Sequence, residues 1–414
     1  MKSGLFPAFP MRSASRSLMG ATLLAISALF GANVRAEQPP FDQWLTGVER
    51  EAVARGLSAD FAARALSGVQ QVERVIELDN KQPEFTQTFW AYLDKRVTDS
   101  RIERGRDLLT RHKDLFARIE AQYGVQARFL VAFWGLETNF GSFTGKMPML
   151  SSLATLAYNP RRADFFREQL LTALDLMAAG DLAVDAESSW AGAFGNVQFM
   201  PTTFKAHAVD GDGDGKRDHF GSLPDIFASA SNFLRAAGWQ PDRTWGREVR
   251  VPAGIDLDLT GLGTTKNLTE WQALGVRRFD GRDLPQVDIE ASLIMPAGVR
   301  GPAFLVYQNF RTIMVWNRSV SYAIAVGHLA DRFIGQPPFL SPRRAEQPLS
   351  RQDVMDMQGR LAALGFETGG VDGILGSGTR KAIRAFQKAS GLPADGHADA
   401  TLLEAVRKAG AGGG

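Results

Sequence analysis

The sequence predicts an α+β protein that is mainly α-helical and has more than one domain. Apolar residues recur at three- and four-residue spacings from about residue 41 to 240, which is typical of amphipathic helices. Strand-like segments follow between about 247 and 315, and a proline-rich break at 335–349 then precedes a compact unit. A chain of 414 residues also exceeds what one hydrophobic core usually serves.

Residues 1–36 predict a signal peptide. Basic residues precede the apolar run LMGATLLAISALFGA, which is too short to span a bilayer comfortably, and residues 34–36 (VRA) resemble a cleavage site. Translation from Met11 instead of Met1 would give a signal peptide of more usual length. The sequence has no cysteine, so it offers no residue for N-terminal lipidation, a disulfide or a thiolate metal site. We therefore expect a soluble periplasmic protein without a membrane anchor.

The charge balance gives no support to a nucleic-acid partner. The net charge of +2 includes four basic and no acidic residues in the signal peptide, so the mature chain has 43 basic and 45 acidic residues. No later segment is apolar for long enough to cross a membrane. These properties indicate an ordinary soluble globular protein.

The order of the elements predicts the domains. Helices are expected for FDQWLTGVEREAVARG, FAARALSGVQQVERVIEL, ERGRDLLTRHKDLFARIEAQYG, REQLLTALDLMAAG and SYAIAVGHLADRF, and strands for REVRVPAGIDLDL, ASLIMP, AFLVYQ and TIMVW. Residues 37–334 are therefore expected to form a helical domain with a small sheet-bearing insertion, and 350–410 a separate unit after the linker. In that unit VDGILGSGTRKAI and ADGHADATLLEAV share an Asp-Gly turn followed by a threonine expected to cap a helix.

Glu137 is the candidate general acid. It follows the apolar run FLVAFWGL, which is long enough to be a buried helix. A carboxyl group at the end of such a helix loses hydration of its charged form, so we expect a raised pKa that lets it hold a proton near neutral pH. The alternative is a glutamate that caps its own helix or pairs with an arginine, and composition and periodicity do not decide between the two.

The stretch SSWAGAFGNVQFMPTTF (188–204) is a candidate substrate groove. Its small residues allow a close approach of the backbone to a ligand, and Trp190, Phe194 and Phe199 are suited to form the walls. Gln198 is suited to orient polar groups of a ligand. A tightly packed loop between helices would have the same composition.

The segment DGDGDGKRDHFGSLPD predicts a calcium site. Asp210, Asp212 and Asp214 occupy positions 1, 3 and 5 of an EF-hand-like loop, Gly215 the turning position 6, and Lys216 position 7, where its carbonyl would be a ligand. Three carboxylates this close together repel one another unless a cation compensates them. A solvated acidic turn is the alternative.

The loop is incomplete at position 12, where an EF-hand has a bidentate glutamate. Gly221 occupies that position, so Asp218 or Asp225 must complete the coordination sphere.

With GLETNFG, NPRRADFF, SSWAGAFGNVQFMP and DGDGDG in this order, the sequence resembles the lytic murein transglycosylase B family, in a soluble form, over nearly all of residues 40–333. The tail from VMDMQGRL to GLPADG resembles a peptidoglycan-binding domain of the small three-helix type. The resemblance implies a lysozyme-like catalytic core and a monomer. It implies peptidoglycan glycan strands as the partner, with cell-wall synthesis or division proteins as further candidates.

The resemblance also implies a mechanism with Glu137 as the single catalytic residue. The family cleaves the β-1,4 bond between N-acetylmuramic acid and N-acetylglucosamine without water and leaves a 1,6-anhydromuramic end. Ordinary glycosidases use two carboxylates. Here the N-acetyl oxygen of the substrate would take the second role.

Matched position by position, the resemblance implies a set of substrate-binding residues, namely Tyr92, Arg161, Arg162, Ser189, Gln198, Met200, Asn317 and Tyr322. The two arginines would meet carboxylates of the substrate, although a surface charge pair is an equal alternative. Trp316 stands where the family has a tyrosine, so it can stack on a sugar but cannot offer the same hydroxyl. In the metal loop the resemblance favours Asp225 over Asp218.

Two other functions remain open. A hydrolytic muramidase would need a further acidic residue to activate water, and Asp185 and Glu187 are the nearest in sequence. A non-catalytic wall-binding scaffold would keep the fold and the C-terminal unit, but it has no need for a desolvated carboxylate at the end of GLETNFG.

Overall fold

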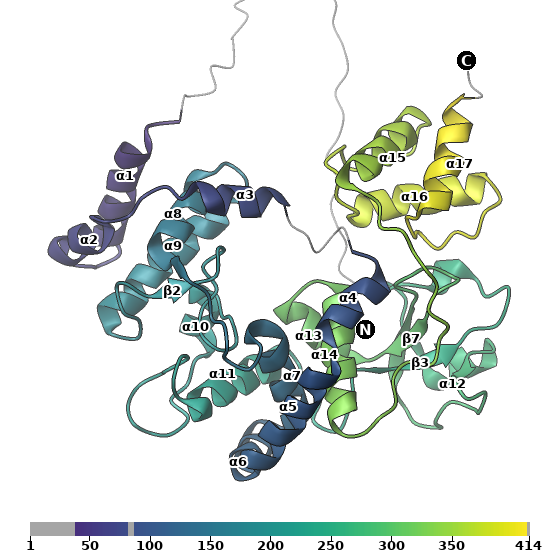
Figure 1. The fold of residues 1–414 in the computed structure, drawn as a ribbon, viewed down its shortest axis with the longest axis horizontal. Coiled ribbons are helices and arrows are strands. Elements are labelled where there is room, and N and C mark those ends of the chain that lie inside the picture. Colours follow the sequence, from purple (N-terminus) through teal and green to yellow (C-terminus); the bar gives the residue numbers. More distant parts are fainter. Residues whose placement is uncertain (1–37, 82–86, 412–414) are drawn as a thin grey trace, which may run out of the picture. The chain divides into compact units, whose positions relative to one another are not determined.

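The structure, a computed structural model, describes residues 38–81 and 87–411. The predicted signal peptide lies outside the described residues. Most of the described chain is helical, and one small sheet is inserted late in the sequence (Figure 1). None of the described helices has the length and apolar character needed to cross a membrane.

Helices dominate the chain up to residue 236, as the periodicity predicts. Four of them begin at a Ser or Thr whose hydroxyl accepts a backbone N–H three residues on, namely Ser58, Thr88, Thr98 and Ser222. The helices are α1 (Phe41–Ala54), α2 (Ala59–Leu66), α3 (Glu73–Lys81), α4 (Phe89–Arg96), α5 (Asp99–Arg111), α6 (Lys113–Tyr123), α7 (Ala127–Thr138), α8 (Met149–Tyr158), α9 (Ala163–Ala179), α10 (Pro201–His207) and α11 (Leu223–Ala236). A short antiparallel pair, β1 (Met147–Pro148) and β2 (Glu187–Ser188), joins the loops before α8 and after α9.

The insertion is an antiparallel sheet with strand order β4-β6-β7-β3-β5. Its register places Leu305 of β7 opposite both Leu293 of β6 and Arg247 of β3. Because side chains alternate between the two faces, Phe304 joins the main core while Leu305 joins a second core under α12. The elements are β3 (Gly246–Arg250), η2 (Leu257–Leu259), β4 (Lys266–Asn267), α12 (Leu268–Ala273), β5 (Arg277–Arg278), β6 (Glu290–Ile294) and β7 (Ala303–Val306).

The strand predicted for TIMVW is wrong, because residues 312–316 form the second half of helix α13 (Gln308–Trp316). A short apolar run does not distinguish a strand from a buried helix, and here tertiary packing decides. Phe310 and Ile313 lie three residues apart and are fully buried in the main core, which is the spacing of a helical face. Helix α14 (Val320–Phe333) follows as predicted.

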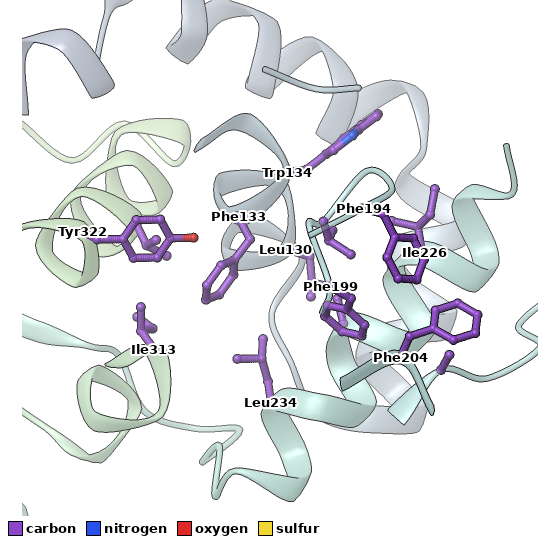
Figure 2. Close-up of a cluster of buried hydrophobic side chains, with 14 of the residues drawn as sticks. Leu130, Phe133, Trp134, Phe194, Phe199, Phe204, Ile226, Leu234, Ile313 and Tyr322 are labelled. Carbon is purple, nitrogen blue, oxygen red and sulfur yellow. The ribbon is translucent and has the colours of Figure 1, made fainter. Parts of the chain in front are cut away.

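Helix α7 is the centre of the main core. Residues Phe129 to Gly135 are all buried, and Figure 2 shows Leu130, Phe133 and Trp134 of α7 between aromatic side chains of the 194–204 segment and Tyr322 of α14. Partly exposed positions lie only at the two ends of α7, at Ala127 and Arg128 and at Leu136 and Glu137. The core therefore fixes the direction in which this helix presents its last turn.

The C-terminal unit has the predicted three helices, α15 (Arg351–Ala363), α16 (Ser377–Ala389) and α17 (Ala400–Ala411), around a core of their own (Figure 1). Residues 336–350 before it contain no helix or strand. The two Asp-Gly turns are related, because Gln358 holds the turn at Asp372 and Gln387 holds the turn at Asp395, each through Nε2 at 2.9 and 2.8 Å.

The predicted threonine cap in this unit is wrong. Thr379 lies inside α16, where its buried hydroxyl accepts a hydrogen bond from Gln358 at 3.0 Å, and Gly376 occupies the N-cap. Helix α16 therefore begins earlier than predicted, and Thr401 likewise lies inside α17, where Asp399 accepts the Leu402 N–H at 2.7 Å.

Candidate active site

Glu137 lies in the last turn of α7 and is half-buried. The helix ends in three successive left-handed residues, Asn139, Phe140 and Gly141, with φ of 50°, 60° and 75°. Two of them are not glycine, which is costly and persists only where packing enforces it. Here the Phe140 ring packs edge-on against Trp134 with centroids 5.8 Å apart, and the Phe140 N–H returns to the Trp134 carbonyl at 3.1 Å. The turn that carries Glu137 is therefore held from both sides.

Two donors converge on one carboxylate oxygen of Glu137. The Trp316 indole Nε1 donates to Oε1 over 3.1 Å, and the Tyr322 hydroxyl donates to the same atom in a short hydrogen bond. Trp316 ends α13 and Tyr322 lies in the first turn of α14. Trp316, which was expected only to stack on a sugar, thus donates its indole N–H to Glu137, a contact that sequence reasoning missed.

Tyr322 stays protonated at any ordinary pH. Burial raises its pKa well above the ordinary value of a tyrosine, and the negative charge of Glu137 raises it further. Tyr92 of α4 contributes in the same direction, and the Arg96 guanidinium stacks 5.0 Å from the centroid of the Tyr92 ring. Both predicted tyrosines are therefore buried, and Tyr92 lies close enough to Tyr322 to raise its pKa.

The aromatic floor beneath Glu137 is continuous. The Trp316 ring packs on Phe133 of α7 with centroids 4.4 Å apart, and it also touches Phe199 at 5.2 Å and Phe233 at 5.1 Å. Figure 2 shows Phe133 between Tyr322 and Phe199. This packing fixes the orientation of the indole N–H toward the carboxylate.

The 188–204 segment is a tight loop held by its own polar groups. The Ser189 hydroxyl accepts the N–H of Ala193 at 3.1 Å, and the Gln198 amide donates to the carbonyls of Thr144 and Gly195 at 2.9 and 3.1 Å. Gln198 has a left-handed φ of 52°. A Cβ at Gly145 would lie 2.2 Å from the Ser188 carbonyl, so the close approach of these two segments requires glycine.

Asn196 links three parts of the site and was not predicted. Its Oδ1 accepts the Trp134 indole N–H at 2.8 Å, its carbonyl accepts the Thr138 hydroxyl at 2.7 Å, and its Nδ2 donates to the Phe220 carbonyl at 2.8 Å. It is 5% exposed. The only signal in the sequence is its place inside the quoted motif, because a buried amide has no periodicity of its own.

Two other predicted residues lie at element ends. Met200 is the N-cap residue of α10, half-buried against the main core, and Asn317 is the C-cap residue of α13, with its side-chain oxygen accepting the Ser319 N–H at 3.0 Å. Asn317 therefore follows directly after the tryptophan that contacts Glu137.

The structure pairs Arg161 and Arg162 with an acidic residue. The Arg162 guanidinium lies 2.5 Å from Oδ1 of Asp79 on α3, and Arg161 donates to the Asp79 carbonyl at 3.0 Å. Asp79 is 1% exposed, whereas each arginine side chain is 42% exposed. The two cations therefore share one buried carboxylate and keep part of their surface in solvent.

The acidic loop gathers the three predicted carboxylates. One oxygen each of Asp210, Asp212 and Asp214 lies within 4.8 Å of the others, and all three residues are exposed. Asp210 accepts the N–H groups of Gly213 and Gly215 at 2.6 and 2.8 Å, and these hydrogen bonds lower its pKa. Clustered carboxylate oxygens are the hard ligands that Ca²⁺ prefers, so the donor set fits the predicted ion.

Asp225 fixes the backbone of this loop through hydrogen bonds. It is fully buried in the first turn of α11, and its two oxygens accept the N–H groups of Gly211 and Asp218, both at 2.7 Å. Burial raises its pKa. The Asp218 carboxylate instead accepts the Phe220 N–H at 2.7 Å. Within the described residues, neither Asp225 nor Asp218 belongs to the three-carboxylate group.

Two family models match the chain. Residues 40–331 match the Transglycosylase SLT domain, and residues 350–406 match the Putative peptidoglycan binding domain. The membrane-bound lytic murein transglycosylase B of Escherichia coli (strain K12) is 32% identical over 283 residues, which are 64% of this chain and 75% of that protein.

Solved structures are similar over a longer span. SltB3 from Pseudomonas aeruginosa, in complexes with NAG-NAM-pentapeptide and NAG-anhNAM-pentapeptide, is 46% identical with TM-scores of 0.85 and 0.84, covering 89% of this chain and 99% of that one. The Escherichia coli lytic transglycosylase Slt35 in complex with calcium is 27% identical with a TM-score of 0.60, covering 71% of this chain and 93% of that one.

Proposed function

Because the chain belongs to the transglycosylase SLT domain family, we propose that Glu137 is the acid and base with which it cleaves the glycosidic bond. The protein is a peptidoglycan lytic transglycosylase with a lysozyme-like core and a C-terminal peptidoglycan-binding domain. The observation that supports the role of Glu137 is its position at the half-buried end of α7, with Trp316 and Tyr322 both donating to one of its oxygens.

The first step breaks the β-1,4 bond between N-acetylmuramic acid and N-acetylglucosamine. Glu137 gives its proton to the leaving oxygen, and the acetamido carbonyl of the muramic residue closes on C1 to form an oxazolinium. The carboxylate formed on Glu137 is then stabilised by the donors from Trp316 and Tyr322, because hydrogen bonds to an ionised group are strong.

In the second step the same carboxylate acts as the base. It takes the proton from the C6 hydroxyl of the muramic residue, and O6 displaces the acetamido oxygen from C1 to close the 1,6-anhydro ring. Glu137 is thereby returned to its protonated form. The complex of SltB3 with NAG-anhNAM-pentapeptide supports this product. The aromatic floor limits the access of water, which favours the internal attack over hydrolysis.

The remaining predicted residues are proposed to bind the substrate. Ser189 and Gln198 would face the sugar from the tight loop, with Tyr92, Met200, Asn317 and Tyr322 around the cleaved bond. Arg161 and Arg162 would meet substrate carboxylates through the part of their guanidinium groups that Asp79 leaves in solvent.

Calcium is proposed to stiffen the loop that follows the site. Its ligands would be Asp210, Asp212, Asp214 and the carbonyl of Lys216, with Asp225 completing the set or holding the loop from below. The calcium complex of Slt35 supports this proposal. The loop reaches α7 through Asn196, which bonds both the Phe220 carbonyl and Trp134. The metal would thus act on the structure and not on the chemistry.

We also propose the setting in which the enzyme works. Residues 1–36 would direct export to the periplasm, 37–334 would form the catalytic domain, 335–349 the linker and 350–410 the domain that holds the polymer. The mature protein would be a soluble monomer without a membrane anchor.

The test is mass spectrometry of soluble products after incubation of sacculi with the mature protein and with its Glu137→Gln variant. We expect anhydro-ended muropeptides from the wild type and a loss of about a thousandfold or more in the variant, with unchanged binding to sacculi. Glu103→Gln on α5 is the matched control, because this exposed carboxylate has no proposed role.

Reducing-end products from the wild type would favour the hydrolytic alternative and direct attention to Asp185 and Glu187. No products from either protein would favour the scaffold alternative. Turnover retained by Glu137→Gln would show that another residue is the acid.

A further inference from the structure

A cavity lies at the start of α13, the helix that ends at Trp316. It has a volume of about 410 Å³ and lies between the start of α13, the segment before β3, and strands β4 and β6. Ligand sites typically measure about 300–1,000 Å³. Arg311 lines this cavity, and it lies five residues before Trp316, so the cavity is about 7–8 Å along the helix axis from the tryptophan that holds Glu137.

The cavity carries cationic groups that the protein does not neutralise. Arg243 and Arg311 line it, and within the described residues neither forms an ion pair with a carboxylate. Arg311 is oriented by neutral acceptors, the Leu262 carbonyl and the Ser292 hydroxyl, both at 2.7 Å. The Arg243 guanidinium has no hydrogen-bond partner among these residues. Two uncompensated guanidinium groups on one cavity are suited to a carboxylate.

The start of α13 adds donors on the same side. Tyr307 is its N-cap residue and makes no side-chain capping hydrogen bond, so the first N–H groups of the helix lack a side-chain acceptor. Tyr307 and Gln308 both line the cavity. Tyr307 is 8% exposed, and its hydroxyl has no partner among the described residues. This hydroxyl is therefore a further polar group that a ligand in the cavity can contact.

The cavity also has an acidic rim. Asp288 and Glu290 line it, are exposed, and form no ion pair with a described cation, although Asp288 accepts the Asn267 amide at 2.8 Å. The cavity is therefore lined by two arginines and two carboxylates that form no ion pairs with each other. A ligand that carries both a carboxylate and an amine would complement both.

We propose that this cavity binds the stem peptide of peptidoglycan, a short peptide that carries carboxylates and a free side-chain amine. Arg243, Arg311 and the start of α13 receive a carboxylate, and Asp288 and Glu290 receive the amine. This proposal rests on the proposed function only because it takes peptidoglycan as the polymer that the protein binds. Because α13 joins the cavity to Trp316, a peptide seated there would place its own glycan strand beside Glu137 and lower KM for strands that carry stems.

The experiment is calorimetric titration of the full chain carrying Glu137→Gln, so that the fragments stay intact. The ligands are a disaccharide with its stem peptide, the same fragment with amidated carboxylates, the same fragment with an acetylated amine, and the bare disaccharide. We expect amidation to weaken binding about tenfold or more, because a charge-assisted hydrogen bond is lost, and acetylation to weaken it less.

Arg243→Gln should reproduce the loss for the free stem and have no effect on the amidated one. Arg243 makes no side-chain hydrogen bond that folding would lose, and Arg118→Gln, an exposed arginine on α6, is the matched control. Glu290→Gln should weaken binding of the free amine but not of the acetylated one. In the background with Glu137 intact, Arg243→Gln should raise KM for stem-bearing strands and leave kcat unchanged.

Equal binding of all four ligands, or equal losses for the free and the amidated stem in Arg243→Gln, would overturn the proposal. Calorimetry measures binding and does not depend on cleavage. A wild type that releases no anhydro products would therefore refute the proposed function without affecting the conclusion about stem-peptide binding.

Discussion

The indole Nε1 of Trp316 donates to Oε1 of Glu137 over 3.1 Å, across 179 positions of sequence. The Tyr322 hydroxyl donates to the same oxygen. An indole can donate a hydrogen bond but cannot accept one, so Oε1 is the acceptor in this contact and a proton carried by Glu137 would lie on its other oxygen. Trp316 therefore helps to hold the side chain of Glu137, the proposed acid.

We predict that Trp316→Phe lowers kcat about tenfold or more. The phenyl ring keeps the packing on Phe133, but the donor to the carboxylate is lost at the moment when negative charge develops there. Trp316→Tyr supplies a hydroxyl and should recover most of the rate. Release of anhydro products from defined glycan fragments measures the effect, and a Trp316→Phe variant as fast as the wild type would contradict the role.

Calcium should raise the melting temperature of the mature protein. A ligand present at about 100 times its dissociation constant stabilises the fold by about 2.7 kcal/mol, provided that it binds only the folded state. Asp210→Asn combined with Asp214→Asn should remove the rise, because two of three clustered carboxylates are lost. Asp242→Asn, an exposed acidic residue outside the loop, is the control. Identical melting curves with calcium and with chelator would argue against the site.

Removal of residues 350–414 should weaken binding to sacculi about tenfold or more and leave turnover of short fragments unchanged. The cut keeps the linker, because Phe339 packs on His328 with centroids 3.8 Å apart and on Phe304 at 4.8 Å. The removed helices have a separate core. Co-sedimentation with sacculi is the measurement, and equal binding by the two proteins would refute an anchoring role.

Acid should destabilise the fold in part through His328. Burial lowers its pKa to about 3, and the nearby Arg332 and Arg343 act in the same direction. An unfolded histidine titrates near 6.5, so the unfolded state binds the proton first and stability falls as the pH drops from about 6.5 toward 3. Between pH 7 and 5 this one group should cost roughly 2 kcal/mol.

The matching variant is His328→Phe, which keeps an aromatic ring against Phe339 and removes the titration. Its free energy of unfolding in urea should fall by roughly 2 kcal/mol less than that of the wild type between pH 7 and 5. His112→Gln, a half-exposed histidine, is the control and should follow the wild type. If the free energy of unfolding fell equally in His328→Phe and the wild type, protonation of His328 would not be the cause of the acid destabilisation.

Much of the fold follows from local patterns in the sequence. The three- and four-residue periodicity predicts the helices up to residue 236, and most of the insertion's central strands fall where β-branched and apolar runs indicate them. The exception is residues 312–316, whose helical state depends on the burial of Phe310 and Ile313 against elements far along the chain. A run of five residues does not contain that information.

The candidate site divides in the same way. Glu137, the small-residue loop and the three aspartates at positions 1, 3 and 5 are visible as motifs, because each depends on neighbours within a few residues. The pairing of Arg161 and Arg162 with Asp79, more than 80 positions away, is not visible in this way.

The sequence by itself determined which residue types are present and in what order, and this was sufficient to identify the polymer and to predict the acid and the metal loop. Only the tertiary structure decided which groups meet: the two donors on Glu137, the Asn196 link to α7 and the charges that line the cavity at the start of α13. The physical reason is range, since capping, turns and periodicity act over a few residues, whereas a buried hydrogen bond depends on where whole helices pack.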